Sequence, residues 1–189
     1  DLATRRRREI IEASIKVISE KGYHAARIED IATELGIGHG TFYRYFENKR
    51  DIFDHVTNYI VQSITEVVAD ERPDESDSLQ EYREQLFRIG DGMFRVFIDN
   101  SHISKILFYE IFGLGEEMEK RIQEIFDLFG RYTEMYLING VEKGFLRQDL
   151  HTRETSLAIN AMIFEAARRL AQSQDPESEY KLWLESIVD

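Results

Sequence analysis

A short segment near the start of the chain concentrates side chains that can bind phosphates and the edges of bases. Between Gly38 and Phe46 the sequence GHGTFYRYF places imidazole, hydroxyl and guanidinium groups around two apolar rings, Phe42 and Phe46. A helix this short, with so many polar groups, has little surface left for a core. Because these donors suit phosphates and base edges, we expect the segment to face nucleic acid.

The residues before this segment predict the helix and the turn that would position it. One helical face carries apolar residues at the spacing of an amphipathic helix, namely Ile28, Ile31, Ala32 and Leu35. Gly36 follows them, at the place where a left-handed residue ends many helices. The next helix is predicted to start near Gly38 and to run to about Phe46, and a third begins soon after.

Residues 27–53 resemble the helix-turn-helix of the TetR family of one-component transcriptional regulators. The family pattern runs roughly T-V-x-x-I-A-x-x-x-G-V-S-x-G-T-L-Y-x-Y-F-x-x-K-x-x-L. Identical residues occur without a gap at Ile31, Ala32, Gly36, Gly40, Thr41, Tyr43, Tyr45, Phe46 and Lys49, and conservative replacements occur at Ile28, Ile37, Phe42 and Ile52. The resemblance covers about residues 5–55, and the remainder is similar in length and helical texture only.

This resemblance implies that the chain binds double-stranded operator DNA. The implied contacts are Arg27, His39, Gly40, Thr41, Tyr43, Arg44, Tyr45 and Lys49. Arg27 stands where the pattern has a capping Thr, and it would either contact a phosphate or remain solvated. Gly38 replaces a capping Ser, a change that costs only about a few tenths of a kcal/mol. The run Arg5–Arg8 would reach a flanking phosphate or the minor groove, with a solvated basic start as the alternative.

The charge of the chain is divided unequally along the sequence. Residues 1–50 carry ten Lys and Arg against eight Asp and Glu, whereas residues 51–189 carry 14 against 28. One end therefore tolerates phosphate and the other repels it. We expect residues 1–50 to form the DNA-binding domain and residues 51–189 to form a ligand-binding and dimerisation domain.

The apolar periodicity predicts an all-α protein, with a three-helix helix-turn-helix domain followed by a helical bundle. Helices are expected over residues 4–21, with Thr4 as the N-cap and Gly22 at the end, and over 49–71. After a loop at 72–78, further helices are expected over 79–99, 102–112, 116–143, 152–173 and 177–188. No pattern with a period of two residues supports a strand.

Composition excludes several kinds of site. The chain has no cysteine, so disulfides, thiolate metal ligands and a cysteine nucleophile are impossible. The five histidines are dispersed without a metal-binding spacing, and Ser101-His102 is more naturally a helix start than a nucleophile. We therefore expect no enzyme activity, no metal and no cofactor.

The sequence also indicates where the protein works. It has neither an apolar run of ~20 residues that could span a membrane nor a visible signal peptide. We therefore expect a cytoplasmic protein that does not enter a membrane. Because the sequence begins at Asp1 rather than Met, we also expect a segment before it.

Aromatic residues are dense in the second part of the chain, and helical spacing places most of them in a core. TetR-family regulators enclose a ligand in this region, and a cavity of such residues would prefer an apolar or aromatic molecule. The residues implied as lining are Phe94, Phe97, Phe108, Phe112, Phe129, Tyr132, Tyr136 and Phe164. Glu110, Asn139 and Asn160 are candidates for orienting the ligand. The alternative is a fully packed core with no ligand.

The last two predicted helices carry more apolar surface than the core of a single chain needs to bury. The resemblance implies that they pair with their two-fold mates as a four-helix bundle. The residues implied at this homodimer interface are Ala158, Met162, Ala166, Leu170, Trp183 and Ile187. An intramolecular core is the alternative.

Together these features predict a ligand-responsive repressor that binds a pseudo-palindromic operator as a homodimer. An apolar small-molecule effector would release it from the DNA. The alternative is an acidic helical protein-interaction module that keeps the DNA-binding fold but binds a protein partner. Binding of DNA by the protein, with an affinity that falls as the salt concentration rises, would distinguish the first hypothesis from the second.

Overall fold

The computed structural model describes residues 2–188 of the chain. The first elements are α1 (Leu2–Lys21), α2 (Ile28–Leu35), α3 (His39–Tyr43) and α4 (Lys49–Thr65), followed by a 3-10 turn at Glu66–Val68. The later elements are α5 (Leu79–Asp99), α6 (Ser101–Lys105), a π-helical turn at Ile106–Glu110, α7 (Glu116–Glu142), α8 (Thr152–Leu170) and α9 (Pro176–Val188). No strand occurs within residues 2–188, and the predicted all-α class is confirmed.

Several helix bounds differ from those predicted. Because α1 begins at Leu2, Thr4 lies inside the helix, and its prediction as an N-cap is wrong. The helix α3 ends at Tyr43 rather than near Phe46, because the chain turns after Tyr43 and brings Phe46 into the core. The α-helical part of α4 stops at Thr65, before a 3-10 turn. The helix predicted over residues 102–112 is instead a short α-helix followed by a π-helical turn.

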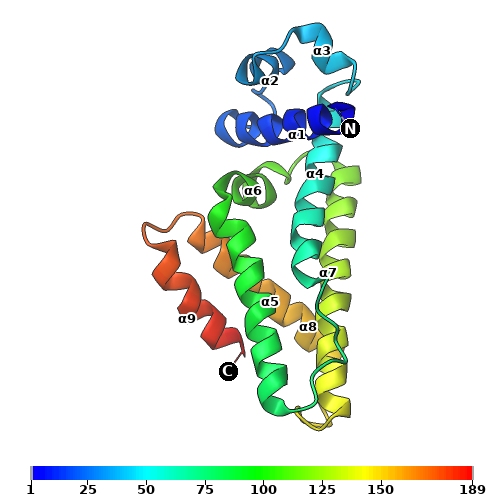
Figure 1. Ribbon diagram of the computed structural model, residues 1–189, viewed down its shortest axis with the longest axis vertical. Coiled ribbons are helices and arrows are strands. Elements are labelled where there is room, and N and C mark those ends of the chain that lie inside the picture. Colours follow the sequence, from blue (N-terminus) through cyan, green and yellow to red (C-terminus); the bar gives the residue numbers. More distant parts are fainter. Residues whose placement is uncertain (1, 189) are drawn as a thin grey trace. The chain divides into compact units, whose positions relative to one another are not determined.

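By packing, the chain divides into two compact units. The first unit contains the chain up to Ser63 together with His102–Gly113, and the second contains Ile64–Ser101 and the chain from Leu114 onward. In the first unit α2 packs against α1, and α3 packs against α2 (Figure 1). The π-helical turn also packs against α1. This division describes packing, and the predicted boundary at residue 50, which concerns function, stays a prediction.

The core of the first unit is built from the apolar faces that the sequence pattern indicates. Its fully buried large side chains include Ile10, Ile18, Ile31, Phe42, Phe46, Ile52 and Phe53. Phe42 enters this core from α3, and Phe46 enters it from the following turn. The remaining faces of α3 are therefore left to solvent, which is the condition for reading DNA.

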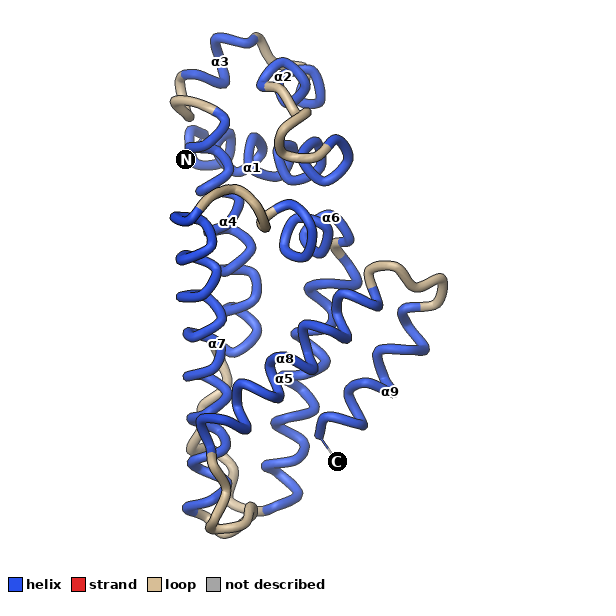
Figure 2. The backbone as a smooth tube through the Cα atoms, turned by 180° about the vertical axis from the view of Figure 1, so that it is seen from behind, coloured by secondary structure: helices blue, strands red, loops and turns tan. Residues whose placement is uncertain are grey.

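In the second unit, α8 runs obliquely between α7 and α9, and α5 packs against α8 and α9 (Figure 2). The buried cluster that joins α5, α8 and α9 consists of Phe94, Ala166, Leu170, Tyr180 and Leu184. Arg95 on α5 also fixes α9. Its Nη1 donates to the Glu177 carboxylate at 2.6 Å, and its Nη2 donates to the Tyr180 hydroxyl at 3.0 Å.

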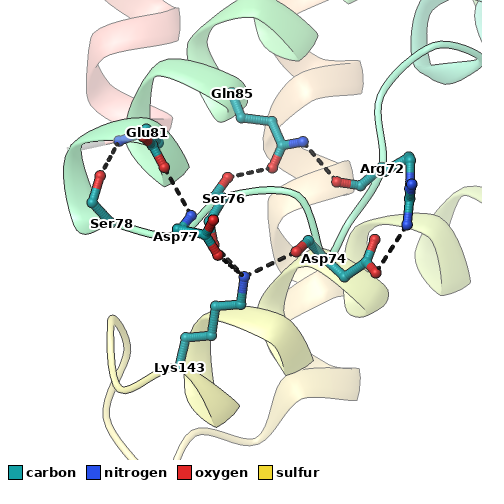
Figure 3. Close-up of polar contacts among 8 residues, drawn as sticks. All are labelled: Arg72, Asp74, Ser76, Asp77, Ser78, Glu81, Gln85 and Lys143. Carbon is teal, nitrogen blue, oxygen red and sulfur yellow. Dashed lines mark hydrogen bonds and ion pairs between the residues drawn. The ribbon is translucent and has the colours of Figure 1, made fainter.

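The loop before α5 is held by Lys143, the residue at the end of α7 (Figure 3). Its Nζ donates to the backbone oxygens of Asp74, at 2.9 Å, and of Ser76, and to the carboxylate of Asp77 at 3.3 Å. The buried Ser76 hydroxyl donates to the Gln85 side chain on α5 at 2.9 Å. These contacts fix the position at which α5 begins.

Gly36 ends α2 in the predicted left-handed conformation, with φ 64°. The Gly36 N–H donates to the Thr33 oxygen at 3.1 Å, and the Ile37 N–H donates to the Ala32 oxygen at 3.0 Å, as in a Schellman motif. We predict that Gly36→Ala lowers the free energy of unfolding by about 1 kcal/mol, because a Cβ disfavours this conformation. Urea unfolding measures the change.

The matched control is Gly40→Ala. Gly40 has no positive φ, and a Cβ added there meets no atom within 4 Å. This variant should be as stable as the unmodified protein or more so, because Ala favours helix. Equal stability of Gly36→Ala and the unmodified protein would contradict the prediction.

Candidate functional site

The short helix α3 and the turn that follows it present most of the residues predicted to contact DNA. His39, Gly40, Tyr43 and Arg44 are exposed, and Thr41 and Tyr45 are half-buried. The His39 and Tyr43 rings meet edge to face, with their centroids 5.0 Å apart. His39 Nε2 lies 3.2 Å from the Glu29 carboxylate on α2. The arrangement offers imidazole, hydroxyl and guanidinium donors along one short helix, as base and phosphate contacts require.

The start of α2 is capped in an unexpected way. Arg27 occupies the N-cap position and is exposed, but a guanidinium cannot accept a hydrogen bond. The Asp30 carboxylate instead accepts from the Arg27 backbone N–H at 2.9 Å and from Lys21 Nζ at 2.6 Å. The Lys21 contact and the backbone N–H hold the pKa of Asp30 below its usual range. Asp30 thus supplies the N3 half of a capping box, and among the described residues no side chain takes the place of the Thr as acceptor for the first turn of α2.

Lys49, at the first position of α4, is engaged within the first unit. Its Nζ donates to the backbone oxygens of Tyr23 at 2.7 Å, His24 at 3.1 Å and Ala26 at 3.0 Å. An ammonium has three donors, so in this structure all of them are used by the turn between α1 and α2. The amine therefore anchors that turn to α4, and its predicted phosphate contact stays a prediction.

Arg7 is a residue that the sequence pattern did not separate from its basic neighbours. Those neighbours pair with carboxylates one turn along α1. Arg7 instead donates to the Tyr45 backbone oxygen at 3.2 Å and to His55 Nε2 at 2.9 Å, and it lies 4.7 Å from the Phe46 ring centroid. Arg7 stands three residues before the buried Ile10, and this shared helical face is the signal that could have identified it.

The segment His102–Gly113 makes one polar contact with α1 and one with the turn that follows α1. Ser19 Oγ lies 2.6 Å from His102 Nδ1, and the Tyr23 backbone N–H donates to the Glu110 carboxylate at 2.8 Å. Glu110 was a predicted orienting group for the ligand, but it belongs to this contact in the first unit. Two predicted lining residues, Phe108 and Phe112, lie on the same segment.

The second unit contains an apolar cavity of about 110 Å³. Of the predicted lining residues, those that line it are Phe94, Phe129, Tyr132 and Tyr136. Phe97 is buried elsewhere, and Phe164 packs against the Phe129 ring at 6.2 Å without lining the cavity. The aliphatic wall, which the sequence reasoning missed, includes Ile64, Val68, Ile159, Ile163, Leu184 and Ile187.

The cavity carries no charge among the described residues, because no Asp, Glu, Lys, Arg or His lines it. Its polar side chains are Tyr132, Thr133, Tyr136 and Asn160. Burial, together with the charges of Glu71 and Glu75, raises the pKa of Tyr136 to about 12. The phenol is therefore neutral at neutral pH, and it donates to the Glu71 backbone oxygen at 3.2 Å. Such a cavity suits an apolar molecule.

The residues predicted at the dimer interface fall into two groups. Ala158 and Met162 are exposed on α8. The others belong to the cluster of α5, α8 and α9 or pack against it, namely Ala166, Leu170, Trp183 and Ile187. A second chain cannot reach Ala166 or Leu170 unless that cluster opens. The surface that remains available on α8 is an apolar stripe of Leu157, Ala158, Ala161 and Met162.

Within residues 2–188, no three His, Asp or Glu side chains gather as metal ligands would. Over the same residues, no helix combines the length and apolar character needed to cross a bilayer.

Comparisons with known proteins agree with this geometry. Residues 10–56 match the model of the bacterial regulatory proteins of the tetR family. The fatty acid metabolism regulator protein of Bacillus subtilis is 24% identical over 145 residues, which make up 77% of this chain and 73% of that protein.

Solved structures share the fold over nearly the whole chain. The fatty acid degradation regulator FadR from Bacillus halodurans has a TM-score of 0.82 at 22% identity, covering 96% of this chain and 94% of that one. The transcriptional regulator FadR from Bacillus subtilis, in complex with stearoyl-CoA, has a TM-score of 0.79 at 25% identity, covering 96% and 97%. Residues 10–56 of this chain thus carry the DNA-binding domain of the tetR family, and nearly the whole chain shares the fold of these regulators.

Proposed function

We propose that the chain is a ligand-responsive repressor that binds a pseudo-palindromic operator as a homodimer. It would release the operator when an acyl chain carried on coenzyme A enters the second unit. His39 and Thr41 would face base edges, and Tyr43 and Arg44 would face phosphates. We assign residues 1–50 to DNA binding and residues 51–189 to ligand binding and dimerisation. Because such a repressor acts on DNA, we also propose that it works in the cytoplasm, and we assign it no catalytic role.

The observation that carries this proposal is an uncharged cavity in the same chain as a helix-turn-helix. Its apolar walls and neutral phenols favour a hydrocarbon chain, whereas they would exclude an ion. The choice of an acyl chain is supported by the relatives, because one is a fatty acid metabolism regulator and another holds stearoyl-CoA.

The size of the cavity supports a response to the ligand. At about 110 Å³ it is smaller than an engineered cavity of roughly 150 Å³ that holds benzene in another protein. A long acyl chain can therefore enter only if the cavity walls move apart. A ligand acts through its preference for one conformation over another. By displacing the walls, the acyl chain would favour a conformation that releases the operator.

For the ligand, we predict that a saturated acyl-CoA weakens operator binding and that the operator weakens acyl-CoA binding by the same factor. Thermodynamic linkage requires this equality, and the factor is typically roughly 5- to 150-fold. Titration calorimetry with and without operator measures both. The variant Ile163→Phe, which fills the cavity, should block the ligand and keep operator affinity.

The control for this cavity variant is Ile138→Phe, at a position on α7 that is 40% exposed. It should alter neither binding event. Equal acyl-CoA affinity with and without operator, at every chain length tested, would contradict the proposed switch.

For Lys49, we predict that Lys49→Ala weakens binding to all DNA sequences because the turn between α1 and α2 loses its anchor. The free energy of unfolding should fall by about 1.5–3 kcal/mol, the range for hydrogen bonds to a charged group. The dependence of DNA affinity on salt should keep its slope. Urea unfolding and salt-dependent DNA titrations measure the two effects.

Arg44→Ala is the contrasting variant, because Arg44 is exposed on the surface proposed to bind DNA. It should leave stability unchanged and reduce the salt slope by about 0.9 for each phosphate that the guanidinium no longer neutralises. If Lys49→Ala instead reduces the slope and spares stability, then Lys49 contacts a phosphate and is no anchor.

For the dimer, we predict that Met162→Glu gives a folded monomer that binds the operator far more weakly. Met162 is 42% exposed, so the charge should break the contact between chains and not the core. The second half-site would then lack the effective concentration that the dimer provides. Sedimentation and circular dichroism at micromolar concentration separate dissociation from unfolding.

Ala167→Glu supplies the comparison, because Ala167 is fully buried within one chain. This variant should lose helicity, since an unpaired charge in the core is costly. Sedimentation of the unmodified protein as a 22.3 kDa monomer would contradict the proposed dimer.

A further inference from the structure

One polar group in the cavity is left without a partner. Asn160, on α8, lines the cavity and is 7% exposed. Its Oδ1 accepts from the Thr133 hydroxyl on α7 at 3.1 Å. Among the described residues no atom accepts from the Asn160 side-chain N–H₂, which is itself buried. A buried amide donor without an acceptor is unfavourable, and native proteins rarely keep one without a reason.

Two hydroxyl groups of the cavity lining already donate to acceptors within the protein. Thr133 donates to Asn160, and the Tyr136 hydroxyl donates to the Glu71 backbone oxygen. The Asn160 N–H₂ is covered in this structure, and it becomes a donor that an incoming molecule can satisfy once the cavity walls move apart. A ligand that brings an acceptor gains this hydrogen bond, whereas a pure hydrocarbon leaves the donor unpaired.

The acceptor must also be neutral. No positively charged side chain lines the cavity within the described residues, so a carboxylate would lie in an apolar space with no counter-charge. Burying an unpaired carboxylate is far more costly than burying a neutral carbonyl. The free carboxylate of a fatty acid is thus a poor match, and the carbonyl of an ester, amide or thioester is a good one.

We infer that Asn160 is a specificity-determining residue that reads a neutral carbonyl oxygen of the effector, with Thr133 positioning its amide. This inference rests on the proposed acyl ligand and adds which atom of that ligand is recognised. The carbonyl lies where α7 and α8 face each other across the cavity, and the apolar chain extends from it along the aliphatic wall.

The test uses two compounds that differ only in this oxygen, octanoyl-CoA and its thioether analogue S-octyl-CoA. The full-length protein should bind the thioester roughly tenfold more tightly than the thioether, as the absence of one hydrogen bond at a buried donor predicts. Asn160→Leu should bring the ratio of the two dissociation constants close to one by weakening the thioester. Methyl octanoate should compete with the thioester, and octanoate should not.

The chain offers a matched control in Asn139. It is 6% exposed on α7, and its side-chain N–H₂ also has no partner among the described residues, but it does not line the cavity. Asn139→Leu should keep the tenfold ratio, which shows that removal of a buried amide is not in itself the cause. Asn160→Ala gives a second variant, smaller than Leu, that must also lower the ratio.

The outcomes separate this inference from the proposed function. Equal binding of both compounds by the unmodified protein, or a ratio that survives both Asn160 variants, overturns the reading of the carbonyl and leaves the acyl ligand standing. Competition by octanoate equal to that by methyl octanoate overturns the requirement for a neutral acceptor. Failure of both coenzyme A compounds to bind overturns the acyl ligand and this inference together.

Discussion

The physical constraint on which the rest of the structure depends is the continuity of the chain between the cavity walls and the unit that holds α3. Helices α5 and α7 both line the cavity, and the chain between them is the segment His102–Gly113 of the first unit. That segment is held to α1 through Ser19, and to the turn after α1 through the bond between Glu110 and the Tyr23 backbone N–H. Ile64, near the end of α4, also lines the cavity. In the proposed switch, a ligand that moved these walls would strain the chain connections that lead to the DNA-binding helices.

Such strain changes DNA affinity only if the first unit responds as a body. Two cations provide that stiffness, because each bonds to backbone oxygens of a turn. Lys49 ties the turn between α1 and α2 to the start of α4, and Arg7 ties α1 to the turn after α3 through Tyr45 and to α4 through His55. These contacts favour movement of the first unit as one body over local melting of α3. In the proposed dimer, the separation of the two recognition helices would then be the quantity that the ligand changes.

Local rules predicted the motif and its turn, because a left-handed Gly36 and buried Phe42 depend on near neighbours. The cavity lining was predictable only in part. Helical spacing identifies a side chain as buried, but it does not tell whether Phe97 or Ile159 faces the empty space. Phe108 was wrongly predicted to line the cavity because its segment packs on α1, and that contact joins residues distant in sequence. Helix α8 is apolar on several faces, so periodicity could not separate exposed Met162 from buried Leu170.

Recognition in the cavity divides into two physically distinct tasks. Burial of a hydrocarbon gains about 0.8 kcal/mol per methylene, whatever the molecule to which the chain belongs, and is opposed here by the cost of parting walls around a small space. For the proposed acyl ligand, the balance of these two free-energy terms would set the preferred chain length. The chemical kind of ligand cannot be read by apolar walls, since they discriminate weakly between similar hydrocarbons. Only a polar group such as Asn160 can supply that choice, because a ligand that leaves its N–H₂ unpaired forfeits the bond.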